Sequence, residues 1–283
     1  MARLLRDLDY ERVIQDTDLA QIINNNAQAK LDVEQSAQAE MISYLVQRYR
    51  TNDIFTNTTV FDPTVTYYGK NLVEFTAAAY NSSSTYGTSS YVTHGGYIYK
   101  GNTSNITGAW DITKWNLICA DKSLFYIKLP YPEYDSTASY TKTNQVWYNK
   151  NIYTCKQNCS NIDPTQTAFW TDDGAYTVSG IYPDDTSKWI AGDNRNQQIV
   201  MYLIDMVLFH LLSRVMPRLI PDLRKERYNG NDPMDRGGAL GWLNKVAKGN
   251  VNADLPEYLM QQGLSMRYGN AGTTALPSHN QLW

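Results

Sequence analysis

The sequence has few of the residues that usually carry catalysis or metal binding. Its 283 residues include only three histidines and three cysteines. His94, His210 and His279 are far apart, and none has a second ligand at helical or hairpin spacing, so we expect no metal site. Cys155 and Cys159 are close in sequence, but three cysteines in so long a chain do not make a disulfide framework. Because glycine-rich phosphate loops and nucleophile elbows are also missing, we expect no enzyme, no catalytic residue and no cofactor.

The chain also lacks an excess of positive charge and a long apolar run. It carries 25 basic and 28 acidic residues and a net charge of -3, so no global positive field exists to hold a nucleic acid. The first residues contain no apolar signal core, and the apolar stretch 199–212 includes Asp205 and His210. We therefore expect a soluble protein, cytosolic at synthesis, that binds no membrane and does not hold DNA tightly.

Arginine is missing from the middle of the chain. All twelve arginines lie at or before Arg50 or at or after Arg195, whereas fifteen of the 22 tyrosines and five of the seven tryptophans lie between Phe61 and Ala191. Long Arg, Glu and Gln side chains suit helix surfaces, while Tyr, Trp, Thr and Val suit the half-buried face of a sheet. The sequence therefore predicts an α+β protein in which a β-rich insert interrupts a helical core.

The boundaries of the insert are predicted near residues 57 and 193. The helical core then consists of residues 1–56 and 194–262, the insert of residues 57–193, and an extended C-terminal tail of residues 263–283. Neither end buries its apolar side chains by itself, so the two ends are predicted to fold as one unit.

Apolar spacing predicts the main helices of this core. Residues 33–50 place apolar side chains three and four positions apart, as in an amphipathic helix. Residues 196–216 are apolar on nearly every side, which predicts a buried central helix. Asp232 and Pro233 provide an N-cap and a first-turn proline for a last helix that ends at Gly249.

The insert contains an imperfect repeat. Residues 96–100 are echoed by residues 150–154, residues 103–107 by residues 159–163, and residues 111–115 by residues 185–189. We predict two related β modules, at about residues 90–118 and 140–190, each with a short hairpin turning at Asn, Gly or Lys. Trp115 and Trp189 are predicted to be equivalent, buried closing residues. The stretch 164–184, rich in Asp, Gly and Pro, is predicted to be a loop.

Four segments in the two ends carry recognisable motifs. They are Ala37-Gln-Ala-Glu40-Met-Ile-Ser-Tyr44-Leu45-Val-Gln-Arg48-Tyr49, the apolar stretch 199–209 around Asp205, Arg224-Lys-Glu-Arg227-Tyr228, and Ala239-Leu-Gly-Trp242-Leu243-Asn-Lys-Val246-Ala247-Lys-Gly249. In their order and spacing these segments resemble the head-tail connector, or head-completion, proteins of Mu-like prophages and related tailed phages. The insert stands where those proteins have a short connection, so the resemblance does not extend to it.

This resemblance implies a structural virion protein of the neck, assembled in the cytoplasm of a host bacterium. It implies a dodecameric ring below the portal that extends the DNA channel and joins head to tail. The expected partners are further copies of the chain, the portal protein and other neck or tail proteins, with genomic DNA only passing through the channel. The insert is expected to project outward, because a module placed between two helices leaves the core undisturbed.

A basic cluster follows the central helix and is a candidate ring or portal interface. Its arginines are Arg214, Arg218, Arg224 and Arg227. The competing interpretation is a solvated helix end, which the helix dipole favours by a few tenths of a kcal/mol. Contact with DNA passing through the ring is a further alternative.

The insert separately resembles small chitin-binding or cellulose-binding modules. The matching segments are Asn144-Gln-Val146-Trp147-Tyr148-Asn-Lys-Asn-Ile152-Tyr153 and Pro164-Thr-Gln-Thr-Ala-Phe-Trp170. A glycan or protein-docking surface is then predicted at Tyr99, Trp110, Tyr148 and Trp170, with Trp110 and Trp170 as the exposed pair. The competing interpretation is that these rings form the module cores, because such small modules have few aliphatic side chains. The alternative function is a glycan-binding virion decoration or host-recognition module.

Overall fold

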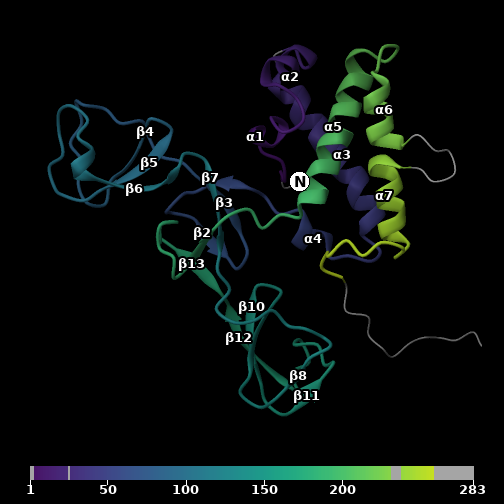
Figure 1. Cartoon of the computed structure of the whole chain (residues 1–283). Coiled ribbons are helices and arrows are strands. Elements are labelled where there is room, and N and C mark those ends of the chain that lie inside the picture. Colours follow the sequence, from purple (N-terminus) through teal and green to yellow (C-terminus); the bar gives the residue numbers. More distant parts are fainter. Residues whose placement is uncertain (1–2, 25, 231–236, 258–283) are drawn as a thin grey trace, which may run out of the picture.

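A computed structural model describes residues 3–24, 26–230 and 237–257 (Figure 1). The fold is α+β, with 30% of the described residues in helix and 24% in strand. A helical bundle lies on one side of the molecule, and small β-sheets project from its other side and from below it (Figure 1). The predicted tail, residues 263–283, and the predicted helix start at Asp232 and Pro233 lie outside the described residues.

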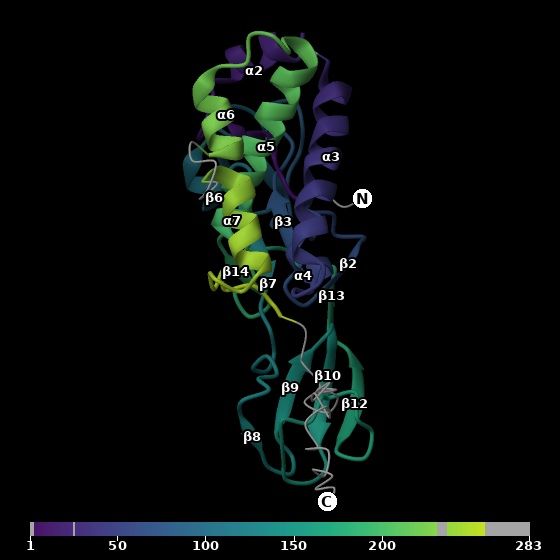
Figure 2. The same ribbon diagram turned by 90° about the vertical axis from the view of Figure 1, so that its right-hand side faces the viewer.

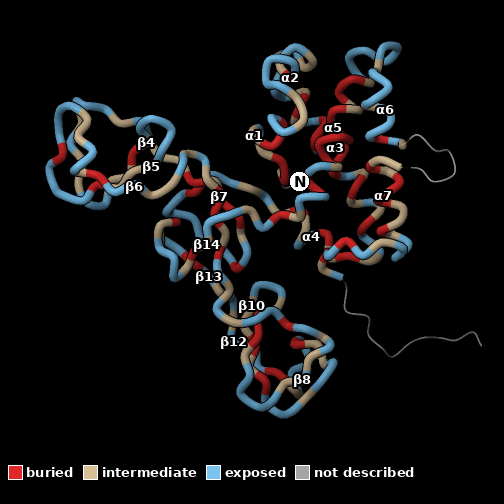
Figure 3. Tube along the Cα trace, in the orientation of Figure 1, coloured by how far each residue is buried: buried red, intermediate tan, exposed pale blue. Residues whose placement is uncertain are grey.

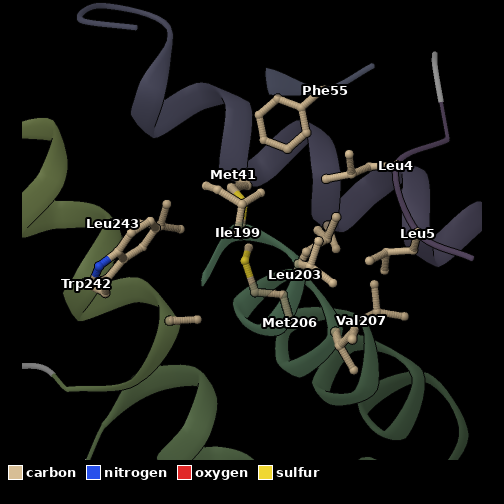
Figure 4. Packing of buried hydrophobic residues seen from close by; sticks show 14 of the residues in the cluster. Leu4, Leu5, Met41, Phe55, Ile199, Leu203, Met206, Val207, Trp242 and Leu243 are labelled. Atoms are coloured by element: carbon tan, nitrogen blue, oxygen red, sulfur yellow. The ribbon is translucent and has the colours of Figure 1, made fainter. Parts of the chain in front are cut away.

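The helical bundle is built from both ends of the chain. Its N-terminal helices are α1 (Asp7–Tyr10), α2 (Asp16–Ile22), α3 (Ala27–Leu45) and α4 (Thr51–Ile54), and its C-terminal helices are α5 (Gln197–Val215), α6 (Asp222–Asn229) and α7 (Gly238–Ala247). Helix α5 packs against α3, and α7 packs against both (Figure 2). One hydrophobic cluster contains Leu4 and Met41 from the first end and Leu203 and Leu243 from the second (Figure 4). The two ends therefore share a single core.

Helix α5 is the centre of this core, as its apolar pattern predicts. Ten of its residues are buried, and the side chain of Asn196 caps it by accepting hydrogen bonds from the backbone N–H groups of Gln198 and Ile199. By length and composition, α5 is the one helix in the described ranges that is able to span a membrane, but 56% of that span is buried within the fold. That burial is typical of a core helix.

Among the described residues, the last helix runs from Gly238 to Ala247. Its start lies against the end of α6, a helix that the sequence analysis did not predict. A Cβ atom on Gly238 would lie 2.6 Å from the carbonyl oxygens of Glu226 and Arg227. The close approach of the two helices therefore requires glycine at this position.

The insert contains three modules with the same topology, each a three-stranded antiparallel sheet. Module A consists of β3 (Leu72–Phe75), β7 (Ser123–Ile127) and β14 (Trp189–Ala191), with β1 (Thr59–Val60) added parallel to β3. Module B consists of β4 (Tyr91–His94), β5 (Tyr97–Gly101) and β6 (Trp115–Ala120), with the 3₁₀ turn Ile112–Lys114 before β6. Module C consists of β9 (Gln145–Tyr148), β10 (Asn151–Cys155) and β12 (Trp170–Ala175).

A second, shorter antiparallel pairing recurs in every module. In module A it joins β2 (Thr66–Tyr68) to β13 (Thr177–Ser179), and in module C it joins β8 (Ser139–Tyr140) to β11 (Cys159–Ser160). In module B it is reduced to a bridge between Tyr86 and Ile106. The three modules therefore share both their main sheet and this minor pairing.

Modules B and C are inserted into connections of module A. In modules B and C the first two sheet strands are joined by two-residue turns, Gly95-Gly96 and Asn149-Lys150, in which every residue has positive φ, as two-residue hairpins favour. In module A the chain leaves β3, forms the whole of module B and returns in β7. It then forms module C before β13. Because each insertion replaces a turn or loop, the ladders of module A stay intact.

Two predictions about the insert are wrong. The second predicted module does not extend to residue 190, because module C ends at Ala175 and the following strands belong to module A. Residues 164–184, predicted to be a loop, contain β12 and β13. The repeat copy at residues 185–189, which ends at Trp189, belongs to module A and not to module C. Because the strands of module A are far apart in sequence, this third module was not predicted.

Candidate interaction surfaces

Each module is built around three aromatic rings in one arrangement. The three sets are Phe61, Tyr67 and Trp189 in module A, Tyr80, Tyr86 and Trp115 in module B, and Tyr134, Tyr140 and Trp170 in module C. The first two rings stack with centroids 5.8, 5.4 and 5.4 Å apart, and the tryptophan meets the first ring at 86°, 88° and 89°. These rings supply the apolar burial that small modules otherwise lack.

A turn closed by the tyrosine hydroxyl precedes each sheet. The Tyr67 hydroxyl accepts a hydrogen bond from the Asp62 backbone N–H at 2.7 Å and donates one to the Asp62 carbonyl at 3.2 Å. Tyr86 makes the same pair of bonds with Asn81, and Tyr140 with Asp135. The underlying sequence signal, which was not predicted, is an aromatic residue, Asp or Asn, any residue, Ser or Thr, any residue, Ser or Thr, and Tyr. It begins at residues 61, 80 and 134.

Trp170 is not a surface residue, contrary to the prediction. Its side chain is 1% exposed, and its Nε1 donates a hydrogen bond to the Ile162 carbonyl at 3.0 Å. Trp189 makes the equivalent bond to Ile181 at 2.9 Å. Trp170 is therefore the core tryptophan of module C, just as Trp115 and Trp189, which are buried as predicted, are the core tryptophans of modules B and A.

Trp110 and Tyr99 lie together in module B, where the Trp110 ring contacts several other rings. The Trp110 ring stacks on His94 at 4.0 Å and 14° and on Trp115 at 5.4 Å and 14°. Tyr99 meets its edge, with centroids 5.0 Å apart. Trp110 is thus half-buried and engaged by three rings of its own module, which leaves less of its ring for stacking on a sugar.

Tyr148 is held in place within module C. Its hydroxyl donates a hydrogen bond to Asp163 at 3.1 Å, and its ring contacts Tyr134 and lies under the Arg50 guanidinium at 5.6 Å. Burial and the Asp163 carboxylate raise the pKa of Tyr148 to about 12. Tyr148 and Trp170 thus belong to module C and Tyr99 and Trp110 to module B, and the two modules form separate arms (Figure 1). The four residues do not form one surface.

The basic cluster divides into two pairs with different roles. Arg224 and Arg227 point to Asp205 on α5, at 3.6 and 3.3 Å. Burial raises the pKa of Asp205 above its ordinary value, and the two guanidinium groups offset part of this rise. Arg214 and Arg218, by contrast, are exposed, and neither forms an ion pair with any described residue. Only this second pair is available to a partner.

Exposed apolar side chains surround the two available arginines. We call residues 214–223, which join α5 to α6, the α5–α6 tip. Its exposed large hydrophobic residues are Val215, Met216, Leu219 and Leu223, at 49%, 38%, 75% and 55% exposure. The tip lies at one end of the bundle and is mostly exposed (Figure 3). Four such residues within nine positions make it a candidate docking surface.

A buried ion-pair network ties the core to the insert. Arg195 directly precedes Asn196, the N-cap of α5. Its guanidinium forms ion pairs with Asp9 at 2.6 Å and Asp193 at 2.7 Å, and its side chain is 2% exposed. Arg6 continues the network with a 3.3 Å bond to Glu74 on β3. Module A is therefore fixed to the bundle by charges as well as by the chain itself.

The described residues offer little that is suited to chemistry. No group of three or more His, Cys, Asp or Glu among them is arranged to hold a metal ion. The sulfur atoms of Cys155 and Cys159 are 3.7 Å apart, and burial raises the pKa of Cys159 to about 11, which favours an unreactive thiol. A cavity of about 360 Å³ beside α3 has Arg3 and Glu34 in its wall, already paired at 2.8 Å.

No protein-family model matches the chain, and no curated protein matches its sequence.

Proposed function

We propose that this chain is a structural protein of a tailed bacteriophage, which forms a head-tail connector ring below the portal, extends the DNA channel and joins head to tail. The ring is dodecameric and contacts the portal and further neck or tail proteins. DNA passes through its channel without being held.

The observation that carries the proposal is that the motif residues of the four separate segments contact one another. The Tyr228 hydroxyl donates a hydrogen bond to Glu40 at 2.7 Å, which joins the third motif to the first. Arg227 bonds to Asp205 at 3.3 Å, which joins the third to the second. Tyr202 stacks on Trp242 at 4.8 Å, which joins the second to the fourth. The residues that carry the resemblance thus form one packed unit, which supports the proposal.

The arrangement of the insert fits the same proposal. Both of its ends meet the N-terminal segment: the Thr58 backbone N–H donates to the Arg3 carbonyl at 3.1 Å, and Arg195 Nη1 donates to the Leu4 carbonyl at 2.8 Å. The modules leave the bundle at this one place and extend away from α5, α6 and α7 (Figure 1). A ring of bundles accordingly carries the modules on its outer side.

The alternative, a glycan-binding module, has less support. Trp170 is a core residue, Trp110 stacks on His94 and Trp115, and Tyr148 is held by Asp163 and Arg50. Calorimetric titration with chitin and cellulose oligosaccharides at millimolar concentration separates the two functions. Binding that is lost in Trp110→Ala but kept in the native chain would favour the alternative.

Negative-stain electron microscopy of the purified protein, alone and mixed with the portal protein of the same phage, tests the proposal. We expect rings that sit coaxially on the portal. Isolated particles that never associate with each other or with the portal would contradict it.

A further inference from the structure

The α5–α6 tip combines exposed apolar area with unpaired positive charge. Leu219 is the most exposed large hydrophobic residue of the described chain, at 75%. Arg214 and Arg218 precede it in sequence, and no described residue forms an ion pair with either. Because a group of exposed apolar side chains marks an interaction site, and charged groups favour partners of opposite charge, the tip favours a partner that is acidic and partly apolar.

An acidic and partly apolar surface exists elsewhere on the same chain. Glu11, Asp16 and Asp18 are exposed and form no ion pair with the described residues. Half-buried apolar side chains lie beside them, among them Ile14 and Ile22. We call residues 11–22 the α2 surface.

The two surfaces lie at the same end of the bundle but belong to different sides of it. The α2 surface is on the side of the N-terminal helices, and the α5–α6 tip is on the side of α6, with α5 between them (Figure 1). Arg214 and Arg218 pair with none of the acids of the α2 surface within one chain. In two copies placed side by side, the tip of one faces the α2 surface of the next.

We propose that the α5–α6 tip of one copy docks on the α2 surface of a second copy, with Arg214 and Arg218 against Asp16 and Asp18 and Leu219 against the apolar side chains beside them. The contact is head-to-tail, because its two halves are different surfaces of one chain. Such contacts close into a ring or continue as a filament. The inference rests on the proposed ring and assigns its subunit contact.

Charge reversal on each side tests the contact. Arg214→Glu with Arg218→Glu places acids against acids, and Asp16→Lys with Asp18→Lys places bases against bases. Sedimentation velocity at low salt measures association of each variant and of the native chain. We expect each double variant to associate roughly tenfold or more weakly than the native chain, since like charges across an interface repel.

Mixing the two variants gives the sharper result. In an equimolar mixture, the acidic tip of the arginine variant can dock on the basic α2 surface of the aspartate variant. The native tip of the aspartate variant can likewise dock on the native α2 surface of the arginine variant. We therefore expect head-to-tail assembly to return in the mixture, although neither variant assembles alone. The control is Lys128→Glu with Lys142→Glu, which removes the same charge from two exposed lysines of the insert that lack ion pairs with described residues. This control is expected to assemble like the native chain.

The outcomes separate the inference from the proposed function. If both double variants assemble like the native chain, or if the mixture stays dissociated, the assigned contact is wrong and the ring proposal stands. If the native chain is monomeric at every concentration with and without portal, the ring proposal itself is contradicted.

Discussion

The Arg195 guanidinium lies 2.6 Å from the Asp9 carboxylate, although 186 residues separate the two in sequence. Both side chains are almost fully buried, and Asp9 also accepts a hydrogen bond from the Arg6 backbone N–H at 2.7 Å. This pair joins the first helical turn to the residue at which the chain leaves the β insert. It is the polar counterpart of the shared hydrophobic core.

Removing this pair should destabilise the bundle strongly. Asp9→Asn leaves the Arg195 charge buried with only Asp193 as partner, so we expect a loss of about 3 kcal/mol in the free energy of unfolding. Urea denaturation followed by helical circular dichroism measures it. The matched control is Asp16→Asn, an exposed carboxylate without an ion-pair partner among described residues, which should change little. An equal effect of both variants would show that the buried pair does not hold the ends together.

The same pair predicts the direction of the pH dependence. Burial by itself raises the pKa of Asp9, but the hydrogen bonds from Arg195 and from the Arg6 backbone outweigh it, and the pKa lies below the ordinary 3.8. A carboxylate with a lowered pKa stabilises the fold fully above 3.8 and loses that contribution as the pH falls through its folded value. We therefore expect the native chain to lose stability below about pH 4. The slope of unfolding free energy against pH should be shallower in Asp9→Asn, and an unchanged slope would refute this origin.

The two ends of the chain should fold without the insert. The contacts of Thr58 and Arg195 with residues 3 and 4 bring the insertion points together, so a short Gly/Ser linker can replace residues 58–193. We expect a helical circular dichroism spectrum and a cooperative thermal transition. A spectrum typical of an unfolded chain would show that the insert is needed to form the core.

Leu243 should be a major contributor to the stability of the bundle. It is 0% exposed within the cluster shared by α3, α5 and α7, so Leu243→Ala is expected to cost about 2–5 kcal/mol. Leu219→Ala, at a position 75% exposed, should alter the unfolding free energy by no more than about 0.5 kcal/mol. The difference between the two denaturant midpoints is the measurement. Similar midpoints would place α7 at the periphery.

Trp170 should stabilise module C rather than bind a ligand. Trp170→Ala removes the central ring of the triad, and we expect a local cost of about 3–5 kcal/mol. Hydrogen exchange should then show lost protection across residues 134–175, while α5 keeps its protection. Trp110→Ala, at a partly exposed position in module B, serves as the comparison. Native-like protection of module C in Trp170→Ala would contradict the triad as its core.

The sequence predicted the parts of the fold that depend on local pattern. The all-round apolar stretch at residues 196–216 became α5, because a helix without a polar face must be buried. The Gly95-Gly96 and Asn149-Lys150 turns followed from their tight-turn residues. The α+β class followed from the change in composition between ends and middle.

Long-range pairing was beyond the reach of local patterns. The sheet of module A joins strands at residues 72, 123 and 189, so no window of sequence contains it. Trp170 was mistaken for a surface residue because spacing alone cannot tell which of two closing tryptophans belongs to which sheet. The division of the basic cluster depended on the burial of Asp205 on another helix. Only the tyrosine-closed turn was present as a local signal and overlooked.

The number of copies in the assembly is the decisive test of the proposed ring. Native mass spectrometry of the purified chain bound to its portal counts them without assuming a shape. A single complex that carries a dodecameric ring of this chain is the predicted result. A chain that remains monomeric or dimeric and leaves the portal unbound would contradict the account.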